Sequence, residues 1–268
     1  MKTRAITGFF FVAVMLASVF FGAYAFTAFF LILSVLSLEE FYKLVRTEEV
    51  KPQSLLGLLL AVSLYIPVAL YFLKDEPLLY VLICVPLAVL IIVYELFRNK
   101  SKPFHNIAYT IFGVLFAFLP FCFFYGMAFN DGEYSSHYPL AFLILLWSSD
   151  TGAYLAGTSM GKHKLFERHS PKKTWEGFGG GLFTSLLAAG IISIYFKELS
   201  IQHWLAISAI IVVAGTLGDL SESMLKRSLS AKDSGSLLPG HGGLLDRFDG
   251  LLLAAPLVFV YLQLIKIF

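Results

Sequence analysis

The chain has 268 residues, of which 58% are hydrophobic and only 14% are charged. Soluble domains carry roughly half apolar and about a quarter charged residues, so this composition excludes an ordinary water-soluble fold. The net charge of +2 says little, because the distribution of the charges along the chain matters more than their sum. Cys84 and Cys122 lie in apolar runs and predict buried thiols, not a disulfide framework or a zinc site.

The first apolar stretch, Ile6–Leu38, contains no charged residue. As a single helix it would be about 50 Å long, whereas the hydrocarbon core of a bilayer is about 30 Å thick. We therefore expect two helices that meet near Gly22. The stretch also exceeds the ~7–15 apolar residues of a signal peptide, so we expect it to be retained in the mature protein.

Seven further apolar runs follow, and each is long enough to cross a membrane as a helix. Together with the first two helices they predict an all-α, polytopic membrane protein with about nine transmembrane helices. The seven runs are Ser54–Leu73, Leu78–Phe97, Ile107–Phe129, Pro139–Thr158, Gly177–Phe196, Trp204–Leu220 and Gly250–Ile265.

Basic residues predict the orientation, because cytoplasmic loops of membrane proteins are enriched in Lys and Arg. With nine spans and the N-terminus inside, all but three of the 20 basic residues fall on the inner side. The exceptions are Lys74, Lys197 and Lys266. We therefore expect a multi-pass protein of the inner (cytoplasmic) membrane, with a cytoplasmic N-terminus and an active site that faces the cytoplasm.

The chain divides into two regions of different character. Residues 1–105 contain few polar groups inside their apolar runs and are expected to form a transmembrane scaffold. Residues 106–268 contain two polar inner loops and are expected to form the catalytic region. No internal repeat is evident, so an inverted-repeat transporter gains no support.

Asp150 lies well inside the sixth predicted span. A carboxylate at membrane depth costs on the order of 3 kcal/mol and normally faces a cavity or a partner. We favour a substrate-binding role for it, with a structural ion pair as the alternative.

Three acids are candidate metal ligands. Asp219 ends the eighth span and Asp246 begins the ninth, so a helical hairpin would bring them together; Asp249 follows Asp246 on the same helix face. Carboxylate clusters without cysteine suit a hard cation such as Mg²⁺. The alternative is that these acids cap helices or pair with Lys232 and Arg247.

Basic residues at the inner interface are mixed with Asp, Ser, His and Gly. Attraction to anionic lipids explains the positive charge at about 1 kcal/mol per residue, but it does not explain the mixture. The mixture suits phosphate chemistry, in which cations neutralise phosphate oxygens and carboxylates hold a metal. The candidate cations are Lys172, Lys173, Lys226, Arg227, Lys232 and Arg247.

Two of these assignments have alternatives. Lys226 is four residues after Glu222, which also fits an ordinary surface ion pair on a helix. His241 is followed by Gly242 and Gly243, and this segment fits either a phosphate-binding nest with His241 as proton donor or contact, or a simple turn.

The 27 residues from Ser223 to Asp249 resemble the signature of the CDP-diacylglycerol synthases, or phosphatidate cytidylyltransferases, with every defined position filled. The motif reads SMLKR, four residues, KDSG, two residues, LPGHGGLLDRFD. The upstream segment Ser170–Gly177 and the residues around Asp150 also resemble this family. The resemblance implies that Ser223 and Asp233 contact substrate, together with Gly242 and Gly243.

The resemblance implies a reaction of CTP with phosphatidic acid that yields CDP-diacylglycerol and pyrophosphate and requires Mg²⁺. The many carboxylates leave room for a second cation. The expected partners are these substrates and the lipid bilayer, with no nucleic acid; a homodimer is one open alternative. A secondary transporter, a CTP-dependent lipid kinase and a purely structural membrane protein are the rival interpretations, and the reaction products distinguish them.

Overall fold

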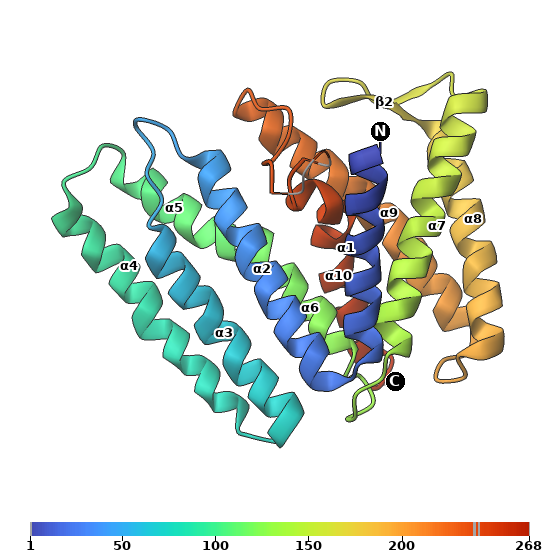
Figure 1. The fold of residues 1–268 in the computed structure, drawn as a ribbon, viewed down its shortest axis with the longest axis horizontal. Helices are drawn as coiled ribbons and strands as arrows, with labels where there is room; N and C mark the ends of the chain where they lie inside the picture. Colours follow the sequence, from blue (N-terminus) through green and yellow to red (C-terminus); the bar gives the residue numbers. More distant parts are fainter. Residues whose placement is uncertain (1, 238–239, 241, 268) are drawn as a thin grey trace. The chain divides into compact units, whose positions relative to one another are not determined.

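The fold was analysed in a computed structural model that describes residues 2–237, 240 and 242–267. Helices account for nearly all of its regular structure, as the composition predicts (Figure 1). The elements in chain order are α1 (Lys2–Phe20), α2 (Ala23–Val45), α3 (Ser54–Lys74), the 3-10 helix η1 (Leu78–Ile83), α4 (Cys84–Arg98), α5 (Pro103–Gly113), the π-helical turn η2 (Val114–Phe118), α6 (Leu119–Met127), α7 (His137–Met160), β1 (Lys164–Phe166), β2 (Ser170–Thr174), α8 (Trp175–Tyr195), α9 (Ile201–Ser228) and α10 (Leu245–Leu264).

The first apolar stretch forms two helices, as predicted. α1 ends at Phe20 and α2 begins at Ala23, with Gly22 at φ +92° between them. Only glycine adopts this backbone conformation at little cost, because it has no Cβ. The glycine therefore breaks one long apolar run into two helices.

Among the described residues, six helices are long and apolar enough to cross a membrane, fewer than the nine expected from the sequence. α1 is not among the six, and its described residues contribute the shorter apolar helix Thr7–Phe20. α2 carries three charges in its last two turns, and α10 begins with charged residues and contains Pro256. The six are Ser54–Lys74, Leu78–Arg98, Pro103–Met127, His137–Met160, Trp175–Tyr195 and Ile201–Ser228.

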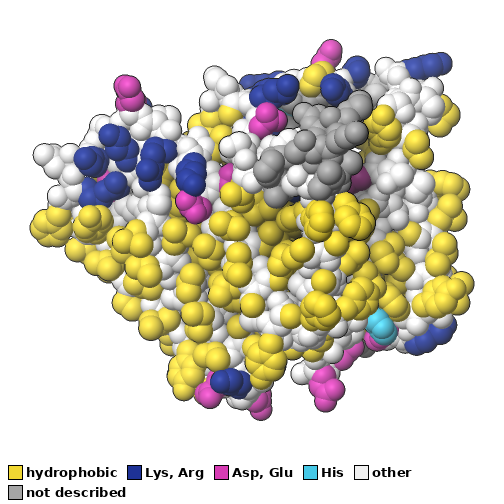
Figure 2. Space-filling model, in the orientation of Figure 1, with side chains coloured by type: hydrophobic (Ala, Val, Ile, Leu, Met, Phe, Trp, Pro, Cys, Tyr) yellow, Lys and Arg dark blue, Asp and Glu magenta, His cyan; other side chains and the backbone are white. Residues whose placement is uncertain are grey.

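Apolar side chains cover the outside of these helices. Leu59 of α3, Val89 of α4 and Ile191 of α8 are among the large hydrophobic residues that are exposed. On the face shown in Figure 2, hydrophobic side chains cover the middle of the helices, and charged side chains lie toward their ends. Such a surface suits lipid and not water, and the chain is a multi-pass membrane protein.

The chain folds into two compact units, Met1–Tyr134 with Ala231–Arg247, and Ser135–Ser230 with Phe248–Phe268. The boundary within α10 separates Arg247 from Phe248. The sequence also predicted a scaffold in residues 1–105 and a catalytic region in residues 106–268. That division concerns where the reaction takes place, and it stays a prediction.

The first unit has an aromatic core contributed by α2, α3 and α6. Phe26 and Phe30 of α2 pack against Tyr125 and Phe124 of α6, with ring centroids 5.9 and 4.9 Å apart. Tyr65 of α3 lies 5.1 Å from the Tyr125 ring, and its hydroxyl donates to a backbone carbonyl of α2 at 3.0 Å. The polar ends of these buried rings are thus satisfied within the core.

The second unit contains α7, α8 and α9, which pack against one another, and the antiparallel hairpin β1–β2. The sequence predicted only a loop here. The backbone N–H of Trp175 donates to His163 O, and the Glu176 carboxylate accepts from the backbone N–H groups of Lys162 and His163. These contacts close the hairpin onto the start of α8.

Candidate active site

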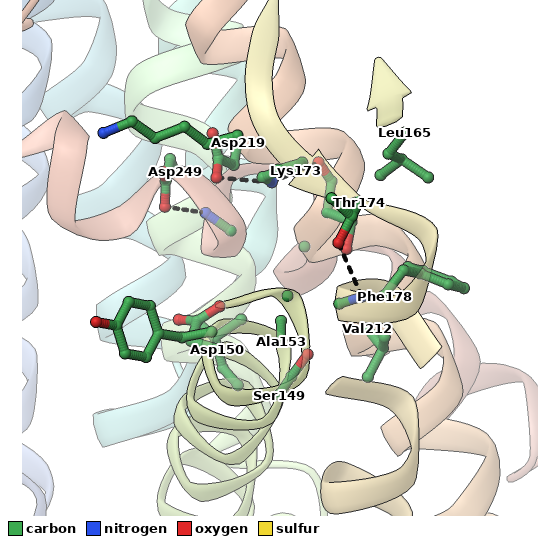
Figure 3. Close-up of a pocket in the computed structure, with 18 of the residues that line it drawn as sticks. Ser149, Asp150, Ala153, Leu165, Lys173, Thr174, Phe178, Val212, Asp219 and Asp249 are labelled. Carbon is green, nitrogen blue, oxygen red and sulfur yellow. Dashed lines mark hydrogen bonds and ion pairs between the residues drawn. The ribbon is translucent and has the colours of Figure 1, made fainter. Parts of the chain in front are cut away.

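A cavity of about 310 Å³ lies in the second unit. It is lined by residues of α7, the β hairpin, α8, α9 and the Asp249–Gly250 segment of α10. Five of the predicted site residues line it, and Figure 3 shows three of their carboxylates and one lysine facing the same space. The five residues are Asp150, Lys172, Lys173, Asp219 and Asp249.

Small residues set the spacing of the helices around this cavity. A Cβ at Gly152 of α7 would clash with Thr184 of α8, and a Cβ at Gly218 of α9 would clash with the backbone oxygen of Asp249. Because glycine is present, α7 approaches α8 closely, and α9 approaches the start of α10. The second approach places Asp219, the neighbour of Gly218, beside Asp249.

An ion pair in the cavity joins Lys173 and Asp219. The Lys173 Nζ is 2.6 Å from Asp219 Oδ2, and both side chains are only partly exposed. Ser223, one turn later in α9, donates to Asp219 Oδ1 at 3.2 Å, and Lys173 Nζ also lies 3.4 Å from the backbone oxygen of Thr216. The cavity therefore contains a cation beside a carboxylate whose second oxygen is oriented by a hydroxyl.

Thr174 fixes the position of this lysine. It ends β2 and caps α8, because its Oγ1 accepts a hydrogen bond from Gly177 N at 3.1 Å. Lys172 and Lys173 precede this cap directly and are held at the cavity by the hairpin. The sequence SPKKTWEG thus combines a strand, two cations and a helix cap.

The carboxylates of Asp150 and Asp249 complete the acidic side of the cavity. Asp249 Oδ1 accepts a hydrogen bond from Gly250 N at 2.7 Å. Within the described part of the chain, no three His, Cys, Asp or Glu side chains converge to hold a metal ion by themselves. Oxygen donors of this kind suit Mg²⁺, which usually takes only one or two carboxylates together with waters and substrate phosphates.

Lys226 lies beyond the cavity, where α9 continues for two turns after Asp219. Its Nζ is 2.5 Å from the carboxylate of Glu222, as the i,i+4 spacing predicts, but this pair does not lie on the surface. The Glu222 side chain is 1% exposed and that of Lys226 13% exposed. Arg227 is exposed in the last turn of α9.

The remaining predicted residues belong to the segment 231–247 of the first unit, which we call the signature loop. Asp246 orders this loop: its Oδ2 accepts hydrogen bonds from the backbone N–H groups of Ser234 and Gly243, both at 2.9 Å. The Ser234 hydroxyl is also within 3.0 Å of it. Asp219 belongs to the other unit, so its pairing with Asp246 around one metal ion stays a prediction.

The other predicted residues of the signature loop are mostly exposed or lie in a turn. Lys232, Asp233 and Arg247 are exposed. Gly242 adopts φ +85° and lies against the Asp246 carboxylate, which supports the predicted turn. His241 lies outside the described residues.

Glu40 of α2 was missed by the sequence analysis. Its side chain is buried, with the residue 6% exposed, and it contacts the signature loop across about 200 positions of sequence. Oε1 accepts from Ser234 Oγ at 2.6 Å and from Leu245 N at 3.0 Å, and Oε2 accepts from Leu244 N at 2.9 Å. The available signal was a Glu inside a largely apolar helix, the same argument that identified Asp150.

The chain resembles known proteins over its whole length. The model of the cytidylyltransferase family matches residues 2–265. A phosphatidate cytidylyltransferase of Bacillus subtilis (strain 168) is 33% identical over 265 residues, covering 98% of both chains. Proteins of the same name from Staphylococcus aureus (strain COL) and Staphylococcus haemolyticus (strain JCSC1435) are 39% and 38% identical over 180 residues, 66% of this chain and 67% of each relative.

Proposed function

The chain belongs to the cytidylyltransferase family, and we propose that it converts CTP and phosphatidic acid into CDP-diacylglycerol and pyrophosphate at the cavity of its second unit. The observation that carries this placement is the Lys173–Asp219 pair, which lies beside Asp150 and Asp249 in one cavity. Cations and carboxylates together are what phosphoryl-group chemistry requires.

The phosphates of the substrates bind through exchange of ion-pair partners. Without substrate, Lys173 is held by Asp219. A phosphate oxygen that enters the cavity competes for the same ammonium group, and the exposed neighbour Lys172 adds a second positive charge. Charge-assisted contacts of this kind are about twice as strong as neutral hydrogen bonds.

The reaction is a direct displacement at phosphorus. An oxygen of the phosphatidic acid phosphate attacks the α-phosphorus of CTP, a new P–O bond forms, and the bond between the α-phosphorus and the bridging oxygen breaks to release pyrophosphate. No covalent enzyme intermediate is needed. A protein base is also unnecessary, because the second pKa of a phosphate monoester is about 6 and much of it is dianionic at neutral pH.

We assign a Mg²⁺ site to Asp219 and Asp249 on the basis of their oxygen donors, with substrate phosphates and water as the other ligands. Bound there, the ion would neutralise phosphate oxygens and offset the repulsion between two anionic substrates. A second cation is compatible with the number of carboxylates. The protein residues bind and orient the substrates, and Asp150 and Ser223 hold the polar groups around the cavity in position.

The other basic and loop residues bind phosphate in this proposal. Lys226 and Arg227 at the end of α9, with Lys232 and Arg247 of the signature loop, supply positive charge. The loop residues Asp233, His241, Gly242 and Gly243 contact the nucleotide or the lipid phosphate.

The lipid substrate stays in the bilayer and reaches the cavity sideways between helices. The site faces the cytoplasm, where CTP is supplied, in the cell inner membrane with the N-terminus on the same side. Light scattering of the purified protein distinguishes a monomer from a homodimer.

Purified protein with radiolabelled CTP and phosphatidic acid tests the proposal, with and without Mg²⁺. We expect labelled CDP-diacylglycerol and stoichiometric pyrophosphate, and loss of both on chelation of Mg²⁺. Formation of CDP with a phosphorylated lipid would identify a lipid kinase, and flux across vesicles without chemistry would identify a transporter. Activity that persists under chelation would remove the metal assignment.

A further inference from the structure

Another cavity, with both polar and apolar lining residues, lies in the first unit, where α2 ends and α3 begins beside the end of α4. It has a volume of about 560 Å³. Arg46, Gln53, Ser54 and Arg98 form its polar part. Figure 2 shows Lys and Arg side chains over the ends of α3 and α4, next to hydrophobic side chains. We call this cavity the arginine slot.

The arginine slot has one cation that is not balanced by an acid. Arg98 pairs with the buried Glu95 at 2.9 Å, and its Nη1 also donates to the Lys51 backbone oxygen. The described contact of Arg46 is different, because its Nη2 donates to the neutral hydroxyl of Ser54 at 2.8 Å. The slot therefore suits a ligand with a single negative charge.

Gln53 contributes an unsatisfied acceptor. It is 5% exposed, and its Nε2 donates to Ile91 O at 2.8 Å and to Glu95 Oε2 at 2.6 Å. Among the described residues, no group donates a hydrogen bond to its Oε1. A buried acceptor without a donor costs about 1–3 kcal/mol, but this oxygen has almost no accessible surface, so it offers no contact to a ligand in the slot.

The other wall of the arginine slot is apolar and faces outward. Leu55 of α3 and Leu90 and Tyr94 of α4 line it, and all three are exposed. Both α3 and α4 belong to candidate membrane spans. A ligand in the slot thus has a charged end at the arginines and an apolar part along helices that face lipid.

From the unbalanced charge of Arg46 and the apolar wall we propose that the arginine slot binds an anionic phosphodiester phospholipid. The phosphate contacts Arg46, with Arg98 beside it. An acyl chain follows Leu55 and Leu90. This site is separate from the cavity that contains Asp219 and does not depend on the proposed reaction.

Native mass spectrometry of the full-length protein with added phosphatidylglycerol tests the proposal. We expect Arg46→Gln to weaken phosphatidylglycerol binding about tenfold, the loss of one charged hydrogen bond of roughly 1.4 kcal/mol. Lys43→Gln is the matched control, because it removes one charge from the same end of α2, where Lys43 pairs with Glu39 on the surface. Ser54→Ala removes the Arg46 contact without changing charge. Both controls should stay within about twofold of the wild type.

Three results would overturn the proposal. Equal losses for Arg46→Gln and Lys43→Gln would mean that only the general positive field attracts the lipid. A full loss in Ser54→Ala would mean that the slot's shape, and not its charge, is responsible. Equal binding of phosphatidylcholine, or equally tight binding of soluble glycerol phosphate, would exclude an anionic lipid as the specific ligand.

Discussion

Replacement of Glu40 by Gln tests whether α2 holds the signature loop in place. The Glu40 carboxylate accepts hydrogen bonds from Leu244 N, Leu245 N and the Ser234 hydroxyl. Hydrogen bonds to a charged group contribute about 1.5–3 kcal/mol each. Gln keeps one carbonyl oxygen but turns an NH₂ group toward a backbone donor, so we expect a net loss of about 3 kcal/mol, between one and two such bonds.

Amide hydrogen exchange measures this loss directly. A local loss of about 3 kcal/mol corresponds to roughly 100-fold faster exchange at Leu244 and Leu245. Because the loop carries several proposed substrate contacts, the turnover of CTP should fall together with the protection. The ordering of the loop, not the chemistry at Glu40 itself, is the expected cause.

Glu39→Gln is the matched control for this experiment. Glu39 is the preceding residue, its side chain is partly exposed, and its pair with Lys43 at 2.7 Å is a surface contact worth at most about 1 kcal/mol. Exchange at Leu244 and Leu245 should therefore stay at the wild-type rate. Unchanged exchange in Glu40→Gln would refute the role of Glu40, and faster exchange with full turnover would show that an ordered loop is not needed.

Three further predictions concern the second unit. Asp219→Asn should lower kcat by about 100-fold, because the proposed metal site loses a ligand. The KM for CTP should not rise, because Lys173 loses the carboxylate that competes with phosphate; a raised KM with normal kcat would contradict this. Lys226→Met removes the cation paired with buried Glu222 and should lower the free energy of unfolding by about 3–5 kcal/mol in thermal unfolding, with recovery when Glu222→Gln is added. Thr174→Ala should destabilise α8 by about 1 kcal/mol and Thr174→Ser much less; equal stability of both variants would exclude the cap.

The sequence predicted the helices well because their signals are local. Uncharged runs of about 20 residues predict apolar helices, and Gly22 predicts the break between the first two. The number of membrane spans was less predictable. In α2 the apolar run is followed by three charges in the last two turns of the helix, and Phe26, Phe30 and Phe41 of the same helix are fully buried within the protein. Burial of this kind depends on tertiary packing, which hydropathy does not report.

The cavity could be predicted in part, because a charge inside an apolar run is costly wherever it occurs. That argument identified Asp150, the end of an apolar run identified Asp219, and the spacing to Asp246 identified Asp249. It did not predict that Lys173 pairs with Asp219, since these residues are far apart in sequence and meet through the hairpin and α9. The i,i+4 spacing predicted the Glu222–Lys226 pair but not its burial, because spacing on one helix does not report what covers it.

The acids of this chain differ in the groups that they bind. This difference distinguishes the acids that stabilise the signature loop from the acid that takes part in the reaction. Glu40 and Asp246 accept hydrogen bonds from backbone N–H groups, which are fixed in place and remain bonded throughout a reaction. Asp219 forms an ion pair with the flexible side chain of Lys173, which can leave Asp219 and bind a phosphate instead. Loss of a backbone-bonded carboxylate should therefore appear first as disorder of the loop, whereas loss of Asp219 should appear first in kcat with the fold intact. Because these two effects are measured separately, stability and turnover data on the same variants can assign each acid to one class.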